Sequence, residues 1–348
     1  MGLVYAEDVD ALARDGRIDW KELEGRDVVI TGSTGLIGGL GARALMRHTE
    51  ITDAPAIRLT LLVRDEERAR RLLGDDGNLR YVRWDANVGA VPDILDASYI
   101  LHCASNTDSA RMVTHPLETI RTTVAGTEAM LELARRTKAR MVFVSSMEVY
   151  GAGSERTLTE ADGGALDAMN GRSSYPQAKQ LAETLCAAYA SEYDTQVSVA
   201  RLAQTFGAGI RDTDNRIFCE IARRCRSDED IELATDGSKR NMYCYTRDAV
   251  CALLMLLTKG LPQTAYNVAN EDTFCSVLEM AQMAANRFSK TTAVHANVNP
   301  KAASKYAVTG SIRLDTTRIS KLGWEPTFGL LDMFQRMMDD WQDAQGQA

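Results

Sequence analysis

Short apolar segments alternate with longer amphipathic segments along roughly the first 200 residues of the chain. The apolar segments are nearly continuous, a pattern typical of strands that are buried on both faces. The longer segments repeat apolar residues about every 3.6 positions, which is typical of helices packed along one side. The pattern predicts strands at residues 27–31, 58–63, 79–83, 98–103, 140–146 and 196–201, and helices at residues 36–48, 66–73, 114–137 and 174–193.

The alternation predicts an α/β fold, in which helices cover both faces of a parallel sheet. The alternation of strands and helices ends near residue 205, and the later sequence predicts a smaller region of mixed helices and strands. Residues 1–25 precede the first strand and predict a helical lead-in that docks on the main body. Beyond the break, helices are expected at residues 217–225, 276–288 and 329–344, and an extended segment at residues 265–270.

Composition limits the partners that the chain can have. Of its 348 residues, 45% are hydrophobic and 25% are charged, which is enough for a sizeable core. The formal net charge is −8, and the isoelectric point is about 5.2. Such an acidic chain is a poor general binder of nucleic acid or of membrane surfaces, so we expect neither as a partner. Any anionic ligand must be held by local groups.

Cysteine and histidine usage bears on compartment and metal binding. Seven scattered cysteines without a CxxC pair are typical of reduced thiols in a cytoplasmic protein. The four histidines lack metal-binding spacing such as HExxH, so no metal site is expected. The sequence has no apolar run of membrane-spanning length, and its start is acidic, unlike a signal peptide. These features predict a soluble cytoplasmic protein.

The segment VVITGSTGLIGG places three glycines at the spacing G-x-x-G-x-x-G, directly after a strand and at the start of a helix. Glycine allows the tight turn and the close approach of the backbone to a pyrophosphate, which the helix N-terminus attracts. In this strand–turn–helix context the motif predicts a bound dinucleotide. The residues expected to line the cofactor here are Gly32, Ser33, Thr34, Gly35, Leu36, Ile37 and Gly38.

The choice between NAD and NADP stays open in the sequence. A carboxylate after the second strand binds the adenosine ribose of NAD, whereas a cation there suits the 2′-phosphate of NADP. The strand ends LLVRD, so Arg64 and Asp65 compete for this role. Asp85, followed by Ala86 after the third strand, is placed to bind the adenine. We therefore expect NAD, with NADP as the alternative.

A Ser–Tyr–Lys constellation follows from three positions. Tyr175 and Lys179 are four residues apart, one turn from each other on one face of a helix. A nearby ammonium and a nicotinamide cation both favour the phenolate, so we expect a lowered pKa for Tyr175 and a role as general base. Ser146 lies about 30 residues earlier at the carboxyl end of a strand, where open α/β sheets bind ligands. It can share the substrate hydroxyl with Tyr175.

Several motifs in order resemble the extended short-chain dehydrogenase/reductases, within them the nucleotide-sugar, NAD-dependent epimerase/dehydratase family. The resemblance covers roughly residues 26 to 345. It rests on TGxxGxxG (31–38), LHCAS (101–105), VSSMEVYG (144–151), YPQAK (175–179), ARLAQTFGAG (200–209) and AYNVAN (265–270).

The resemblance implies a Rossmann-type doubly wound parallel sheet with a smaller mixed C-terminal substrate lobe. It also implies a nucleotide-diphosphate sugar as substrate, and a homodimer that packs through helices 114–137 and 174–193. The expected division of the chain is a lead-in (1–25), a dinucleotide-binding domain (26–205, with a return segment at about 241–270) and a substrate-binding lobe (206–240 and 271–348).

The resemblance also assigns roles to individual residues. Ser146, Tyr175 and Lys179 are the implied catalytic trio. Gln204 stands where related chains often have an asparagine that contacts a substrate phosphate, and Arg240 resembles an arginine that clamps the diphosphate. Asn215 and Arg216 are weaker candidates for the same anion. The residues implied to lie along the cofactor are His102, Cys103, Ala104 and Ser105.

The implied chemistry begins with oxidation at the sugar C4, after which epimerisation, dehydration or decarboxylation can follow. Dehydratases of the dTDP-glucose type carry Asp and Glu after the catalytic serine or threonine, whereas this chain has Met147 and Glu148. A thioether cannot donate a proton, so Glu148 is expected to act alone, as a base or as a group facing a carboxylate. The alternatives are an NADPH-dependent carbonyl reductase and a non-catalytic NAD(P)-binding protein.

Overall fold

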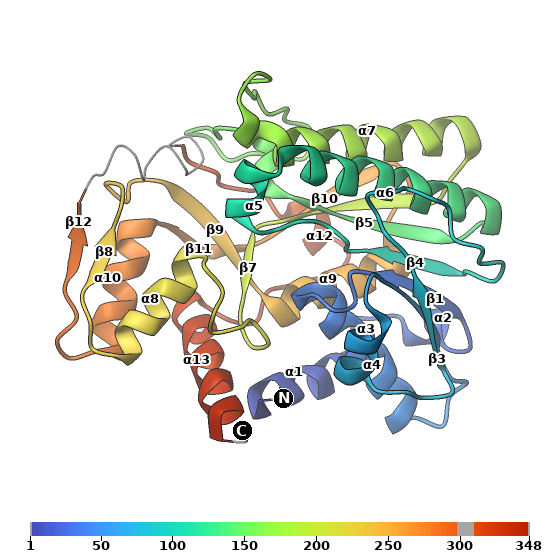
Figure 1. Cartoon of the computed structure of the whole chain (residues 1–348), viewed down its shortest axis with the longest axis horizontal. Coiled ribbons are helices and arrows are strands. Elements are labelled where there is room, and N and C mark those ends of the chain that lie inside the picture. Colours follow the sequence, from blue (N-terminus) through green and yellow to red (C-terminus); the bar gives the residue numbers. More distant parts are fainter. Residues whose placement is uncertain (1, 298–309, 347–348) are drawn as a thin grey trace.

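A computed structural model describes residues 2–297 and 310–346 of the chain (Figure 1). Its centre is a seven-stranded, fully parallel sheet with the order β10-β6-β5-β4-β1-β2-β3. The α/β prediction is therefore confirmed. The strands are β1 (Asp27–Thr31), β2 (Arg58–Val63), β3 (Leu79–Arg83), β4 (Tyr99–His102), β5 (Arg140–Ser146), β6 (Val197–Leu202) and β10 (Thr264–Val268).

The strand order reverses direction at β1, because β2 and β3 lie on one side of it and β4 lies on the other. Open α/β sheets bind ligands outside the carboxyl ends of the strands at such a switch point. Four predicted strands match the structure in full, at residues 27–31, 58–63, 79–83 and 140–146. The strand expected at 98–103 is one residue shorter at each end, and the strand expected at 196–201 is shifted by one residue.

Helices cover both faces of the sheet, as Figure 1 shows. On one face, α6 and α7 lie side by side over β4, β5 and β6. On the other, α3 packs against α9, and α9 contacts the same strands from below. These helices and the shorter ones between them are α3 (Leu36–Ile51), α4 (Glu66–Leu73), α5 (Ser109–Thr114), α6 (Pro116–Thr137), α7 (Ser174–Tyr193), α9 (Thr246–Lys259) and α12 (Thr317–Ser320).

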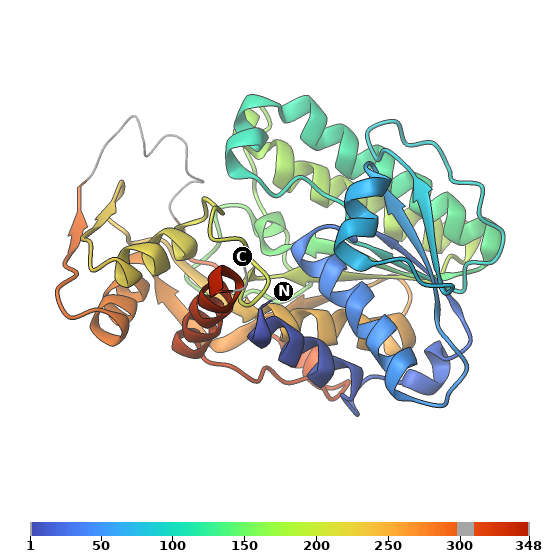
Figure 2. The same cartoon turned by 60° about the horizontal axis from the view of Figure 1, so that its bottom comes forward.

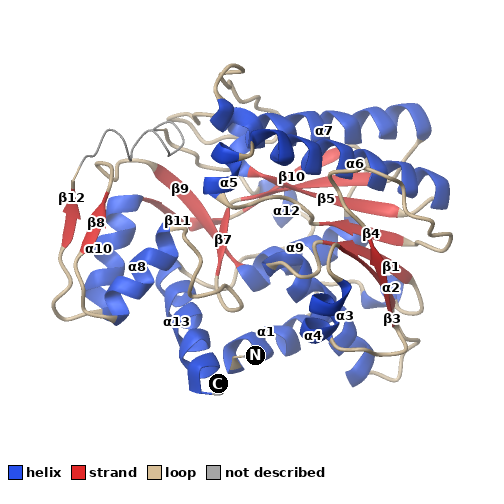
Figure 3. Ribbon diagram, in the orientation of Figure 1, coloured by secondary structure: helices blue, strands red, loops and turns tan. Residues whose placement is uncertain are grey.

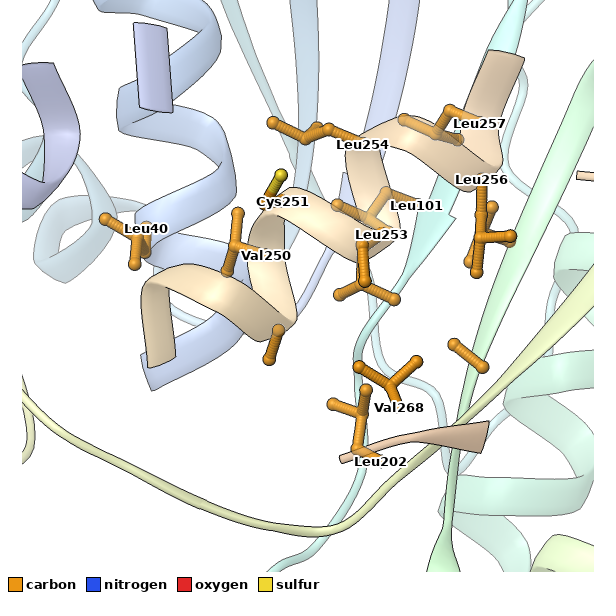
Figure 4. Packing of buried hydrophobic residues seen from close by; sticks show 14 of the residues in the cluster. Leu40, Leu101, Leu202, Val250, Cys251, Leu253, Leu254, Leu256, Leu257 and Val268 are labelled. Carbon is orange, nitrogen blue, oxygen red and sulfur yellow. The ribbon is translucent and has the colours of Figure 1, made fainter. Parts of the chain in front are cut away.

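Two helix predictions need correction. The expected helix 114–137 begins two residues later, as α6, because Pro116 suits a first helical turn, and the short helix α5 before it was not predicted. Helix α9 was missed altogether. Its sequence is apolar on nearly every side, so it lacks the one-sided period that marks a surface helix. Figure 4 shows the reason for this composition: apolar side chains of α9 contact the sheet and α3 at the same time.

The chain's two ends pack together. Helix α1 (Leu3–Ala13), followed by the short α2 (Trp20–Leu23), lies beside α13 (Leu330–Gly346), as Figures 1 and 2 show. Asp8 of α1 is fully buried, accepts a hydrogen bond of 2.5 Å from the Tyr245 hydroxyl and pairs with Arg336 at 2.9 Å. These polar bonds fix the N-terminal helices to the C-terminal part of the chain.

Among the described residues, the smaller region contains two further sheets and three helices around their own apolar cluster (Figure 3). One sheet has the order β11-β9-β7 and the other pairs β12 with β8. Residues 298–309 of the expected substrate lobe lie outside the described part of the chain. The elements here are β7 (Gln204–Phe206), α8 (Ile217–Arg226), β8 (Ile231–Leu233), β9 (Arg240–Tyr245), β11 (Asn270–Ser276), α10 (Val277–Phe288), β12 (Val294–Ala296) and the α13 already named.

In the described residues, no helix combines the length and the apolar character that crossing a bilayer requires.

A buried ion pair ties α7 to β5 and β6. Arg201 of β6 donates to Glu183 of α7 at 2.7 Å, and both side chains are almost fully buried. Glu183 also accepts a 2.6 Å hydrogen bond from the hydroxyl of Ser145, and Arg201 donates to the Tyr150 hydroxyl at 2.8 Å. The network thereby joins the end of β5 to the middle of α7.

We expect Arg201→Met to lower the free energy of unfolding by about 3–5 kcal/mol, because it leaves the Glu183 carboxylate buried without its partner. Urea denaturation would measure this. Arg58→Met is the matched control, since Arg58 pairs with Asp27 at an exposed position and its loss should cost less than about 1 kcal/mol. Equal effects of the two substitutions would contradict the structural role of the Arg201–Glu183 pair.

Candidate active site

The glycine-rich turn brings the start of α3 close to β1 and β4. Gly32 has a φ of +70°, and a Cβ there would lie 3.0 Å from the Ala104 nitrogen. A Cβ on Gly38 would lie 2.5 Å from the Gly32 oxygen. Only glycine fits these two positions without moving the backbone. The predicted tight turn is thus confirmed, at the carboxyl end of β1 beside the switch point.

The turn has the features of a pyrophosphate site. Helix α3 begins without a side-chain cap at Gly35, so its first N–H groups are available to an anion. The hydroxyls of Ser33 and Ser105 are buried and have no hydrogen-bond partner among the described residues. A buried hydroxyl without a partner is unfavourable unless a ligand or water bonds to it. These residues fit a bound dinucleotide.

His102, which the resemblance places along the cofactor, has a buried ring. It is 1% exposed, and its Nδ1 and Nε2 lie 2.7 Å from the Thr31 hydroxyl and 3.2 Å from the Thr127 hydroxyl. Burial lowers its pKa to about 3, so the ring is neutral. Because Thr31 also accepts from the Ala104 N–H at 2.9 Å, His102 helps to fix the backbone beside the glycine turn.

The residues expected at the adenosine end of the site are compatible with NAD and with NADP. Asp65 caps α4 by accepting a 2.9 Å hydrogen bond from the Arg68 N–H. Asp85 is exposed and accepts from the Asn87 N–H at 2.9 Å. Arg64 is exposed and has no ion pair with the described residues. The neighbouring Ala86 is buried against Gly126, so it lies under this end of the site.

The Ser–Tyr–Lys constellation forms where β5 meets α7. Ser146 ends β5, and Tyr175 lies in the first turn of α7, close enough for the serine hydroxyl to act on the pKa of the phenol. Lys179 is one turn further on, 2% exposed, and donates to the Val144 oxygen at 2.7 Å. Its ammonium lies 5.8 Å from the centre of the Tyr175 ring. The structure therefore brings the three predicted side chains together.

The expected lowering of the Tyr175 pKa is not found. Burial raises the pKa of this phenol, and the negative charge of Glu148 raises it further, while the Ser146 hydroxyl opposes them. Lys179 gives little help because its ammonium is directed at the Val144 carbonyl. Tyr175 therefore needs additional positive charge before it can serve as a base.

The two residues after Ser146 point in different directions. The chain makes one 3-10 turn, η1 (Met147–Tyr150), so successive side chains face different sides. Met147 is 1% exposed and packs in the main apolar core, so it does not occupy a catalytic position. Glu148 instead forms an ion pair with Arg172, whose Nη2 lies 3.1 Å from Glu148 Oε2. The carboxylate is thus positioned by a cation.

The predicted substrate-binding residues lie at different distances from this centre. Arg216 pairs with Asp214 at 3.0 Å, and its charge acts on the Tyr175 pKa, so it lies near the constellation. Gln204 is half-buried at the start of β7. Asn215 is exposed. The guanidinium of Arg240 is turned to Glu279, 3.1 Å away, so in this structure it is occupied by an ion pair.

Two residues near the constellation were missed by the sequence analysis. Arg172, in the short helix η2 (Gly171–Ser173), precedes Tyr175 by three residues, and Lys239 precedes the predicted Arg240 by one. Burial lowers the pKa of Lys239, and the charges of Glu148 and Arg172 both act on it. The sequence signal for Arg172 was a cation three residues before the tyrosine of YxxxK. Arg172 lies in a polar loop, however, where charged residues are common.

Lys179 yields a prediction about stability. Burial lowers its pKa from 10.5 to about 8, so the charged ammonium destabilises the folded state. This destabilisation is complete below about pH 8 and decreases as the pH rises to 10.5. We expect Lys179→Met to abolish activity but to raise the free energy of unfolding at about pH 7 by about 1–3 kcal/mol. Denaturation at several pH values should show this gain shrinking above pH 8. A gain independent of pH would contradict the explanation.

Comparison with known proteins adds a family to this geometry. The model of the NAD dependent epimerase/dehydratase family matches residues 28–269. UDP-glucuronic acid decarboxylase 1 of Danio rerio is 26% identical over 263 residues, which cover 75% of this chain and 60% of that protein. UDP-glucuronic acid decarboxylase 3 of Arabidopsis thaliana is 25% identical over 321 residues, which cover 90% of this chain and 89% of that protein.

A solved structure shares the fold over most of the chain. The dTDP-glucose 4,6-dehydratase of Streptomyces venezuelae, with NAD and TYD bound, superposes with a TM-score of 0.76 at 19% identity. The match covers 92% of this chain and 98% of that one. Together with the family model, which spans the central sheet from β1 to β10, it confirms the predicted family and the Rossmann-type fold. The chain belongs to the NAD dependent epimerase/dehydratase family.

Proposed function

We propose that the chain is an NAD-dependent enzyme that oxidises C4 of a nucleotide-diphosphate sugar acid and then decarboxylates it. The observation that carries the first part is the joining of Ser146, Tyr175 and Lys179 at the carboxyl end of β5, beside the glycine turn. When bound, NAD supplies the hydride acceptor for the sugar C4. Ser33, Ser105 and the N-terminus of α3 would hold its pyrophosphate.

Tyr175 would take the proton of the C4 hydroxyl, while Ser146 bonds to the same hydroxyl and orients it. The raised pKa of Tyr175 means that the phenolate forms only when positive charge collects near it. Arg172 and Arg216 already act in that direction. Lys179 can contribute more if its ammonium turns from the Val144 carbonyl towards the phenol. These residues together provide the general base.

Decarboxylation fits the site better than dehydration. A ketone at C4 makes the C6 carboxylate a β-keto acid, so the C5–C6 bond can break, CO2 leaves, and the electron pair enters an enolate. The enolate would then take up a proton at C5, and C4 would take back the hydride, so that the product differs from the substrate by one CO2. The loss of CO2 needs no base at C5. Glu148 is held by Arg172, and Met147 is buried, so the site lacks the free acid–base pair that dehydration would require. The decarboxylase relatives support the same choice, with UDP-glucuronic acid as the substrate.

We also propose a homodimer and a cytoplasmic location. The outer faces of α6 and α7 expose apolar side chains, Leu117 at 65%, Ile120 at 38% and Leu181 at 50%. Two such helices from each copy can form a four-helix interface that covers these residues. All seven cysteines are free thiols, and six of them are buried, which suits a reducing compartment.

The substrate choice can be tested by incubating the protein with NAD and a panel of nucleotide sugars, with product mass as the readout. We expect UDP-glucuronate to lose the mass of one CO2, because only a C6 carboxylate can leave in this way. UDP-glucose and dTDP-glucose should stay unchanged and serve as controls. Loss of water from a neutral sugar would identify a dehydratase. Stoichiometric consumption of NADPH with a carbonyl substrate would identify a reductase.

The dimer is tested by the double substitution Leu117→Asp, Leu181→Asp. Buried charges without partners are strongly unfavourable, so we expect sedimentation to show a monomer where the unaltered protein is a dimer. Leu261→Asp is the control, because Leu261 is 61% exposed but lies outside α6 and α7. A dimer that survives the double substitution would place the interface elsewhere.

A further inference from the structure

Arg172 has two N–H groups that the protein does not use. Its Nη2 donates to Glu148 at 3.1 Å, which holds the guanidinium in place. The Nε and Nη1 atoms are inaccessible to solvent and have no hydrogen-bond partner among the described residues. An unpaired donor of a charged group in a buried position is costly, so such a group usually meets a ligand or an ordered water. The unused donors are therefore a sign of a binding site.

The surroundings of Arg172 favour an anion. Lys239 is half-buried, and Arg216 lies near the same tyrosine. Arg172 and Lys239 act on Glu148, while Arg216 is paired with Asp214, so these three cations face two carboxylates and one positive charge is left over near Tyr175. The chain as a whole carries a net charge of −8, so this local excess of positive charge is not a general property of its surface. It is a property of the site.

We propose that Arg172 recognises the C6 carboxylate of the sugar, with Lys239 as a second cation. The inference rests on the proposed function, because Tyr175 must reach the C4 hydroxyl and C6 is only two carbons from C4. The charge of Arg172 acts on the Tyr175 phenol, so a sugar placed for oxidation has its C6 carboxylate within the reach of this cation. A guanidinium donates to carboxylate oxygens in a fixed, planar geometry. Arg172 is thus a specificity-determining residue.

Glu148 has a positioning role in this arrangement. Its bond to Nη2 leaves Nε and Nη1 without a protein partner, and because their N–H groups lie on opposite edges of the guanidinium, the substrate carboxylate can take only one of the two. Its negative charge also lies near the place where the substrate carboxylate would bind. Like charges at close range disfavour each other, and the departure of neutral CO2 removes one of them. The electron pair of the C5–C6 bond passes to the C4 ketone, so charge moves away from Glu148 as the bond breaks.

The test measures binding without turnover, in a Tyr175→Phe background with saturating NAD. Titration calorimetry compares UDP-glucuronate with UDP-glucose, which differ only at C6. We expect Arg172→Gln to weaken UDP-glucuronate binding by about 10- to 100-fold and UDP-glucose binding by less than about twofold. Arg172→Lys should restore part of the carboxylate affinity. Arg156→Gln is the control, because Arg156 lies in the same loop, 64% exposed, and should change neither affinity.

Equal weakening of both ligands would mean that Arg172 only holds Glu148, and unchanged affinities would place the carboxylate elsewhere. Either result overturns the inference. The proposed reaction is judged separately, by release of CO2 from UDP-glucuronate with unaltered protein. Absence of CO2 together with a carboxylate-specific loss in Arg172→Gln would reject decarboxylation but keep Arg172 as the carboxylate-binding residue. Release of CO2 without that loss would reject the role of Arg172 alone.

Discussion

The contact between the end of β5 and the first two turns of α7 determines the geometry of the site. It is held from within by Lys179, which donates to the Val144 carbonyl, and one turn later by Glu183, which bonds to Ser145 and Arg201. Loss of the Glu183 bonds is expensive, because both partners of its ion pair are largely buried, whereas the Lys179 bond offsets part of the cost of burying that ammonium. These bonds fix Ser146 and Tyr175 relative to each other, and all the chemistry proposed above depends on that distance.

This arrangement places a difficult electrostatic demand on the protein. Tyr175 and Lys179 are both buried, and burial disfavours the charged form of each. A phenolate therefore has to be stabilised by cations brought in from other elements, Arg172 from the loop before α7 and Arg216 from the loop before α8. The acidic chain concentrates positive charge at one point, as an enzyme for anionic substrates must.

Much of the fold could be predicted because buried parallel strands have a simple sequence pattern. Four strands were predicted to the residue, since their apolar runs end at polar turn residues. The glycine turn could also be predicted, because Gly32 and Gly38 are required by close backbone contacts along one local segment. Helix α9 could not, because a helix buried on all sides has no polar face to reveal its period.

The site was predictable only where its residues follow one another along the chain. Ser146, Tyr175 and Lys179 belong to two short motifs, whereas Arg172 gains its meaning from a contact with Glu148, 24 residues away. Arg240 is the opposite case: it belongs to a recognisable motif, but the motif did not predict the ion pair that Arg240 forms with Glu279. The raised pKa of Tyr175 in the protein alone has the same origin, and the expected lowering also counts on the charge of a nicotinamide. Spacing shows that a lysine is near a tyrosine, but burial and the direction of the ammonium decide what the lysine does.

Met147 and Glu148 show how one turn of backbone can select among related reactions. Adjacent in sequence, they are separated by the 3-10 turn, which sends one side chain into the apolar core and the other to Arg172. A proton donor at position 147 would therefore be buried away from the sugar unless the turn itself changed. The chemistry open to this site is set by the environment of a single carboxylate, and that carboxylate is held by a cation. A C5 base must be free to accept a proton, whereas a group that orients Arg172 must stay ionised, and the observed ion pair favours the second role.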